Sequence, residues 1–221
     1  RGVYRTVDGG KTWERVLFVD ENTGCSDIAM DPTNPRILFA GMWPMLIKTW
    51  GKWSGGPGGS LHVSRDGGTT WTRLKGSGLP DTEIGKVGLA VSASNPNRVY
   101  ALIETANEGL WRSDDGGGSW THVNRDHALL NRPLYYTRVL VSPNDADELY
   151  FPATRFHMSQ DGGKTIQRFS PWGGDHHDMW IDPKDPGRMI VANDQGIAIS
   201  TNRGKSWRGI ELPIAQMYHV Y

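Results

Sequence analysis

The sequence has little of several features that would restrict its class. It contains one cysteine, Cys25, so it cannot form an internal disulfide, and a small core residue is a better interpretation of this position than a nucleophile. No apolar run approaches the length of a membrane span, which argues against membrane insertion. Lysine plus arginine and aspartate plus glutamate both number 24, so the chain carries no excess of one charge. Nucleic acid and anionic membranes are therefore not expected partners.

Helical periodicity is also missing. No amphipathic stretch of helical length can be found, which excludes solenoids built of helices. Glycine and tryptophan are abundant instead, with 28 and 10 copies. The glycines indicate a high density of tight turns.

One short phrase occurs five times, with the consensus Ser/Thr-x-Asp-x-Gly-x-Ser/Thr-Trp. Its Asp can accept backbone N–H groups of its own turn, and its glycines tolerate the positive φ of a hairpin corner. The copies, called boxes below, are Thr6–Trp13, Ser64–Trp71, Ser113–Trp120, Ser159–Ile166 and Ser200–Trp207. The third-place residues, which we interpret as structural and not as catalytic acids or metal ligands, are Asp8, Asp66, Asp115, Asp161 and Asn202.

A second phrase recurs between the boxes and begins a turn followed by a short apolar strand. Its copies are Asp31–Phe39, Ser92–Tyr100, Ser142–Tyr150 and Asp182–Ile190. In the unit that is easiest to parse, the pattern predicts strands at Val87–Val91, Arg98–Ile103, Gly109–Ser113 and Trp120–Val123. Four short strands in a repeat of roughly 40–50 residues are typical of a β-propeller blade.

The sequence therefore predicts an all-β fold, a β-propeller of four-stranded antiparallel blades. About four and a half blades are expected, with Gly2–Arg5 as a third strand and Met217–Tyr221 as a first strand, so that the chain is one segment of a larger propeller. The approximate units are 1–23, 24–84, 85–134, 135–174 and 175–221. Each box should form the turn between the third and fourth strands, with its Trp buried against the neighbouring blade.

The boxes resemble the Asp-box, or BNR, repeat of sialidases, two-propeller xyloglucanases and sortilin-type receptors. Several segments are more closely similar to large secreted bacterial proteins that have a sortilin-like region and are often labelled glycosyl hydrolase: Gly41–Trp43, Ser54–Gly59, Asn95–Glu104, Gly174–Asp178, Trp180–Pro183 and Ala215–His219. The resemblance implies an extracellular or periplasmic location in bacteria. It also implies a structural role for the box aspartates.

Function in propellers usually lies at the mouth of the central channel, where the first strand of each blade begins. Seven residues before each second phrase stand Gly24, Gly85, Tyr135 and Asp175, of which only Asp175 carries a carboxylate. The resemblance to two-propeller xyloglucanases implies a catalytic Asp at about this place, with its partner on the other propeller. Asp175 is thus the candidate catalytic residue.

Polar and aromatic residues surround this candidate. Strand alternation would send Asp175 and His177 to one side and His176 and Asp178 to the other. These side chains can be structural, can contact a substrate directly, or can bind a metal if neighbouring blades bring His157 or His219 close. We expect no metal and no cofactor. The candidate ligand-binding residues at the mouth are Tyr135, Tyr136, His176, His177, Asp178, Tyr218 and His219.

An insertion at 43–59 interrupts the first full unit between its second and third strands. It carries Trp50 and Trp53 among glycines, and these rings can either stack on a sugar or grip a peptide, or else cover a blade edge. Three functions follow from these observations. The favoured one is a secreted or periplasmic scaffold propeller that binds a peptide or carbohydrate ligand at the channel mouth. The alternatives are a glycoside hydrolase that uses Asp175 as one catalytic carboxylate, and a structural module that contacts other domains of the same larger protein.

Overall fold

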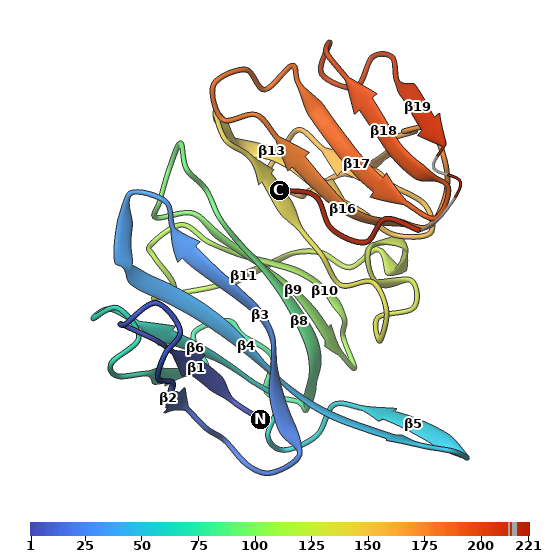
Figure 1. Cartoon of the computed structure of the whole chain (residues 1–221). Coiled ribbons are helices and arrows are strands. Elements are labelled where there is room, and N and C mark those ends of the chain that lie inside the picture. The colour runs from blue at the N-terminus through green and yellow to red at the C-terminus, as the bar shows by residue number, and fades with distance from the viewer. Residues whose placement is uncertain (212, 214–215) are drawn as a thin grey trace.

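The computed structural model describes residues 1–211, 213 and 216–221, and its strands form successive antiparallel blades (Figure 1). Blade 1 consists of β3 (Thr23–Asp31), β4 (Asn34–Lys48), β6 (Ser60–Ser64) and β7 (Thr72–Leu74), and β5 (Gly51–Ser54) pairs with the far end of β4. Blade 2 consists of β8 (Ile84–Val91), β9 (Val99–Thr105), β10 (Gly109–Ser113) and β11 (Thr121–Asn124). The prediction of a propeller with four-stranded antiparallel blades is confirmed.

Two further blades follow in the described residues. Blade 3 consists of β12 (Leu140–Ser142), β13 (Asp145–Phe151), β14 (His157–Ser159) and β15 (Gln167–Arg168). Blade 4 consists of β16 (His176–Ile181), β17 (Met189–Asn193), β18 (Gly196–Ser200) and β19 (Arg208–Glu211). A short 3-10 helix, η1 (His127–Leu130), connects blades 2 and 3.

The two ends of the chain differ from each other. At the N-terminus, β1 (Val3–Arg5) pairs with β2 (Glu14–Leu17) across a box, as expected for third and fourth strands. The segment Met217–Tyr221, called the tail below, has no strand structure. The expectation that it is a first strand stays a prediction, because a first strand pairs with the second strand of its own blade and the described residues after β19 include no such strand. The tail instead contacts blade 4, where the Met217 N–H donates to the Asn193 carbonyl.

Each box forms the turn between a third and a fourth strand, and its third-place side chain closes that turn. In the Asp66 box, Oδ1 accepts the Thr70 N–H at 2.9 Å and Oδ2 accepts the Thr70 hydroxyl at 2.7 Å. These hydrogen bonds lower the pKa of Asp66 to about 2, the Thr70 N–H having the largest effect. Asn202 keeps the arrangement, because its Oδ1 accepts the Ser206 N–H and its Nδ2 donates to the Ser206 hydroxyl.

The box tryptophans are not equally buried: Trp120 is buried as expected, Trp71 and Trp207 are half-buried, and Trp13 is exposed, which corrects the expectation for that residue. Trp120 is 5% exposed and packs in the core between blades 1 and 2, whereas Trp13 is 61% exposed. Trp13 directly precedes β2 in the two-stranded β1–β2 sheet, in which fewer strands surround the ring. The indole N–H donates to the second glycine of its own box in both cases, at 3.1 Å to Gly10 and 3.3 Å to Gly117.

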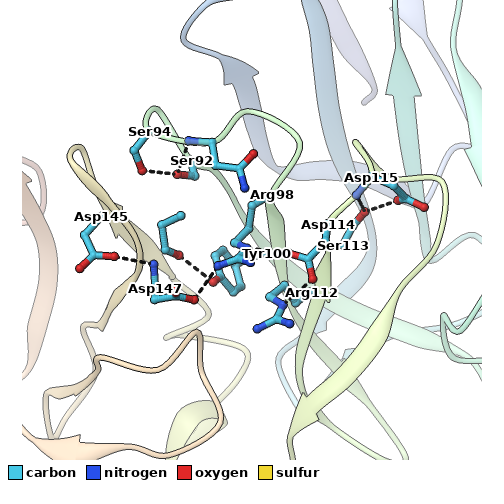
Figure 2. A network of polar contacts seen from close by, with 12 residues as sticks. Ser92, Ser94, Arg98, Tyr100, Arg112, Ser113, Asp114, Asp115, Asp145 and Asp147 are labelled. Atoms are coloured by element: carbon cyan, nitrogen blue, oxygen red, sulfur yellow. Dashed lines mark hydrogen bonds and ion pairs between the residues drawn. The ribbon is translucent and has the colours of Figure 1, made fainter.

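Apolar clusters between successive blades form the core. One joins Phe39 and Val63 of blade 1 to Val87 and Trp111 of blade 2, and similar clusters join blade 2 to blade 3 and blade 3 to blade 4. Polar contacts add to this packing, as Figure 2 shows for Arg98, which pairs with Asp114 of its own blade and with Asp147 of blade 3. The interfaces hold the first strands in fixed positions around the mouth.

Candidate functional site

A cavity of about 370 Å³, called the mouth cavity below, lies where the first strands of three blades and the tail approach one another. Blades 1 and 2 contribute Asp27 and Lys86, blade 4 contributes His177, and the segment before β12 contributes two tyrosines. The full lining is Ser26, Asp27, Lys86, Leu134, Tyr135, Tyr136, Thr137, Arg138, Pro152, His177, Tyr218 and His219.

Tyr135 does not lie at the start of a strand, which corrects the expected equivalence of this position with Gly24 and Gly85. β12 begins only at Leu140, and a loop precedes it. In this loop Arg132 has a φ of 61°, and its carbonyl accepts the N–H groups of both Tyr135 and Tyr136 at 2.9 Å. This tight turn places the two tyrosine rings beside each other at the cavity wall.

Aromatic rings from two segments, the loop before β12 and the tail, gather around His177. The Tyr218 ring from the tail stacks on the imidazole with centroids 3.9 Å apart, and the Tyr136 ring lies nearly parallel at 5.7 Å. The hydroxyls of Tyr135 and Tyr218 are hydrogen-bonded to each other, and this contact together with burial raises the pKa of Tyr218 to about 12. Four of the expected mouth residues therefore converge.

Asp175 lies at the edge of this cluster, one residue before β16. Its φ is 51°, an unusual conformation for a residue other than glycine. The Tyr136 hydroxyl donates to its Oδ1 at 2.6 Å, and the Arg132 guanidinium lies 4.0 Å from the same oxygen. Burial first, and then the contact with Asp175, raise the pKa of Tyr136, so this hydroxyl stays a donor over the working pH range.

His177 has a carboxylate partner that the sequence analysis did not identify. Its Nε2 lies 2.6 Å from Oδ1 of Asp194, a residue that follows β17 directly. The imidazole is only 5% exposed, while the Asp194 side chain is 28% exposed. The pairing fixes the imidazole orientation against the tyrosines.

His176 and Asp178 do not line the mouth cavity, and the pairing of β16 with β17 has a register shift between them, so simple strand alternation does not hold here. His176 is buried against Phe156 with centroids 5.4 Å apart, and burial lowers the pKa of its imidazole. The Asp178 carboxylate is 1% exposed. It forms an ion pair with Arg138 at 2.8 Å and lies 3.3 Å from Nδ1 of His219. These contacts tie the tail to blades 3 and 4.

The sequence analysis missed a second set of equivalent positions. Four residues before each second phrase stand Asp27, Gly88, Arg138 and Asp178. Asp27 makes the same kind of contacts as Asp178, because it accepts the N–H of the residue that follows it and the Leu89 N–H of the next blade at 2.9 Å. Burial raises the pKa of Asp27. Counting the same offset in all four repeats would have found this set.

The insertion forms a hairpin from β4 and β5 that projects away from blade 1 (Figure 1). Trp50 at its tip is 79% exposed and Trp53 is 49% exposed, and neither lines the mouth cavity. The base is fixed to blade 2, since the Trp43 indole donates to the Ser54 hydroxyl and Ser54 is hydrogen-bonded to Glu104. Trp50 and Trp53 therefore lie apart from the other candidate ligand-binding residues.

Two further features of the described residues bear on the site. They contain no group of three or more His, Cys, Asp or Glu side chains that could hold a metal ion, and His157 lies outside the cluster around His177. Within the same described ranges, no helix has the length and apolar character needed to cross a membrane. Burial raises the pKa of the Cys25 thiol to about 11, which agrees with a core role.

The sequence is similar to curated xyloglucanases. A probable oligoxyloglucan-reducing end-specific xyloglucanase of Neosartorya fischeri is 29% identical over 183 residues, which is 73% of this chain and 21% of the relative. A xyloglucanase of Paenibacillus sp. is 29% identical over 160 residues, which is 67% of this chain and 14% of the relative. The chain therefore spans about a fifth or less of the length of these relatives. No protein-family model matches the sequence.

Solved structures with the same fold include glycoside hydrolases. The GH74 xyloglucanase of Xanthomonas campestris has a TM-score of 0.55 at 17% identity, with 94% of this chain and 42% of that chain covered. A structure described as an ancestral GH74 enzyme has a TM-score of 0.58 at 17% identity, with 89% and 25% covered. At this identity the likeness shows the β-propeller fold.

Proposed function

We propose that the chain is the glycan-binding part of a glycoside hydrolase that acts on xyloglucan or a related β-glucan. The observation that carries this proposal is the Asp175 carboxylate beside a wall of aromatic rings. Tyrosine and histidine rings present apolar faces to the C–H groups of a sugar, while their polar atoms hydrogen-bond its hydroxyls. The xyloglucanase names of the sequence relatives support a glycan as the ligand.

The Asp175 carboxylate is held at the edge of the aromatic cluster. The Tyr136 hydroxyl donates to its Oδ1 at 2.6 Å, and the Arg132 guanidinium lies 4.0 Å from the same oxygen. Glycoside hydrolysis needs one carboxylate that serves as nucleophile or base and one carboxylic acid that protonates the leaving group. We assign the first role to Asp175.

The second carboxyl group belongs, in this proposal, to another part of the whole protein. The two-propeller xyloglucanases that the sequence resembles divide the pair between two propellers. This chain would then bind one side of the glycan and contribute one of the two reacting groups. An extracellular or periplasmic location fits the proposal, because xyloglucan is a polymer outside the cell.

The proposal is tested by measuring xyloglucan binding calorimetrically and the release of reducing ends by the whole protein. Asp175→Asn should lower turnover by about 10²–10⁴-fold and change the dissociation constant little, because the amide keeps a hydrogen-bond acceptor for Tyr136. Asp81→Asn, in an exposed loop, is the matched control and should leave both quantities unchanged.

A binding propeller without hydrolytic activity is the second candidate. The Tyr218 ring, which stacks on His177 from the tail, is placed to bind a ligand whether or not any reaction follows. If the wild type binds xyloglucan without turnover, and Tyr218→Ala weakens that binding, the binding function replaces the hydrolase. If xyloglucan neither binds nor reacts, the interpretation of the chain as a structural module replaces both.

A further inference from the structure

A second cavity lies at the base of the projecting hairpin and is separate from the mouth cavity. Its volume is about 410 Å³, and it is called the hairpin cavity below. Its lining includes the apolar side chains of Trp53, Leu46 and Pro44 and the polar residues Asp20 and Asn22. An indole ring and hydrogen-bonding groups in one cavity suit a sugar ring, because a sugar has apolar C–H faces and polar edges.

The polar and the apolar lining of this cavity are both held in place. Asp20 accepts the Thr23 hydroxyl and the Asn22 N–H, both at 2.8 Å, so its carboxylate is oriented before any ligand binds. The Trp53 ring lies over Gly51, where a Cβ would come within 2.7 Å of it. Because the hairpin base is also hydrogen-bonded to blade 2, the cavity needs little ordering on binding.

A third cavity, called the middle cavity below, has a volume of about 550 Å³. Gly55 lines both the hairpin and the middle cavity. Gly85 and Pro133 of the middle cavity directly precede Lys86 and Leu134 of the mouth cavity. The middle cavity is therefore adjacent to the hairpin cavity, and its lining continues in sequence into that of the mouth cavity.

Glu104 stabilises the middle of this path. Its Oε2 accepts the Lys86 N–H at 2.7 Å and is hydrogen-bonded to Ser54 of the hairpin. It thus joins the first strand of blade 2 to the base of the hairpin. Glu83, Thr82 and Thr105 add hydrogen-bonding groups to the same cavity.

We propose that the hairpin cavity is a second sugar-binding site, in which Trp53 stacks on a glycan that extends from the mouth cavity through the middle cavity. This inference rests on the proposed function and specifies its ligand as a polymer that occupies several cavities at once. Trp50 takes no part, because it lies at the hairpin tip outside the cavity.

Calorimetric titration of the whole protein with polymeric xyloglucan and with a short xyloglucan oligosaccharide tests the inference. Trp53→Ala should weaken binding of the polymer by about tenfold, equivalent to about 1.4 kcal/mol, and should leave binding of the short oligosaccharide within about twofold of wild type. Trp50→Ala is the matched control, with the same residue type on the same hairpin, and should change neither affinity.

The outcomes separate this inference from the proposed function. If Tyr218→Ala weakens binding of both ligands and Trp53→Ala weakens neither, the second site is overturned while the mouth site stands. Equal losses from Trp50→Ala and Trp53→Ala also overturn the second site, since they indicate nonspecific attachment of the hairpin. If the wild type binds neither ligand, both proposals fail.

Discussion

The third-place side chain of a box is bound in the same way from blade to blade, whereas the residue four positions before each second phrase is different in successive blades. Asp66 and Asn202 both close their own turn through the Ser or Thr four residues later. At the other position, the Asp27 carboxylate accepts a backbone N–H of blade 2, and the Asp178 carboxylate accepts a backbone N–H of the tail. Blade 2 has Gly88 at this position, which has no side chain to accept such a bond. Repeated contacts thus maintain the fold, and varied residues produce the asymmetric mouth.

Blade packing gives the largest expected difference. Trp120→Ala removes a ring that is 5% exposed between blades 1 and 2, and it should lower the free energy of unfolding by about 3–5 kcal/mol. Trp13→Ala removes the equivalent ring of the β1–β2 pair, which is 61% exposed, and should change stability by about 0.5 kcal/mol or less. Denaturant unfolding measures both values. Equal losses would show that the two boxes are equally packed.

The next prediction concerns the position four residues before the second phrase, which is Arg138 before β12 and Asp178 in blade 4. Arg138→Met removes the cation from the Asp178 carboxylate, which is 1% exposed, and leaves a buried charge without that partner. We expect a loss of about 1–3 kcal/mol in the free energy of unfolding. The double variant Arg138→Met with Asp178→Asn should recover part of this loss, because the uncompensated charge is gone. A double variant less stable than the sum of the single changes would contradict this account.

The contrast also explains how far the sequence predicts the structure. The boxes repeat in sequence because their contacts are local. A box therefore marks where the third strand of its blade ends, and the predicted third strand Gly109–Ser113 matches β10 in both bounds. The first strand expected at the tail stays a prediction, because strand formation depends on a pairing partner elsewhere and not on local pattern alone. Asp194 escaped attention for a related reason, since only the fold brings it to His177, seventeen residues away.

The insertion illustrates the same limit. The sequence predicted an insertion at 43–59 with tryptophans among glycines, but the separate positions of Trp50 and Trp53 follow from the β4–β5 register. Trp53 pairs across the hairpin with Leu46 and lines a cavity, whereas Trp50 occupies the turn. Sequence alone gave both residues the same interpretation.

The smallest effect at neutral pH, and the sharpest test of the local box contacts, concerns acid stability. The pKa of Asp66 is about 2 in the folded protein against 3.8 for a free side chain, because the Thr70 N–H and hydroxyl donate to its ionised form. A carboxylate whose pKa is lowered by folding stabilises the fold above the higher value, and this contribution is lost as the pH falls from about 4 to about 2. Asp66→Asn should therefore cost little at pH 7, since Asn202 shows that an amide closes the same turn, and should make stability less dependent on pH below 4.

The reverse change, Asn202→Asp, should make stability more dependent on pH in the same range. Urea unfolding at pH 7 and at several values below 4 measures both, with Asp81→Asn as the exposed control. An acid dependence that is the same in all these variants would show that the box carboxylates do not contribute to acid sensitivity.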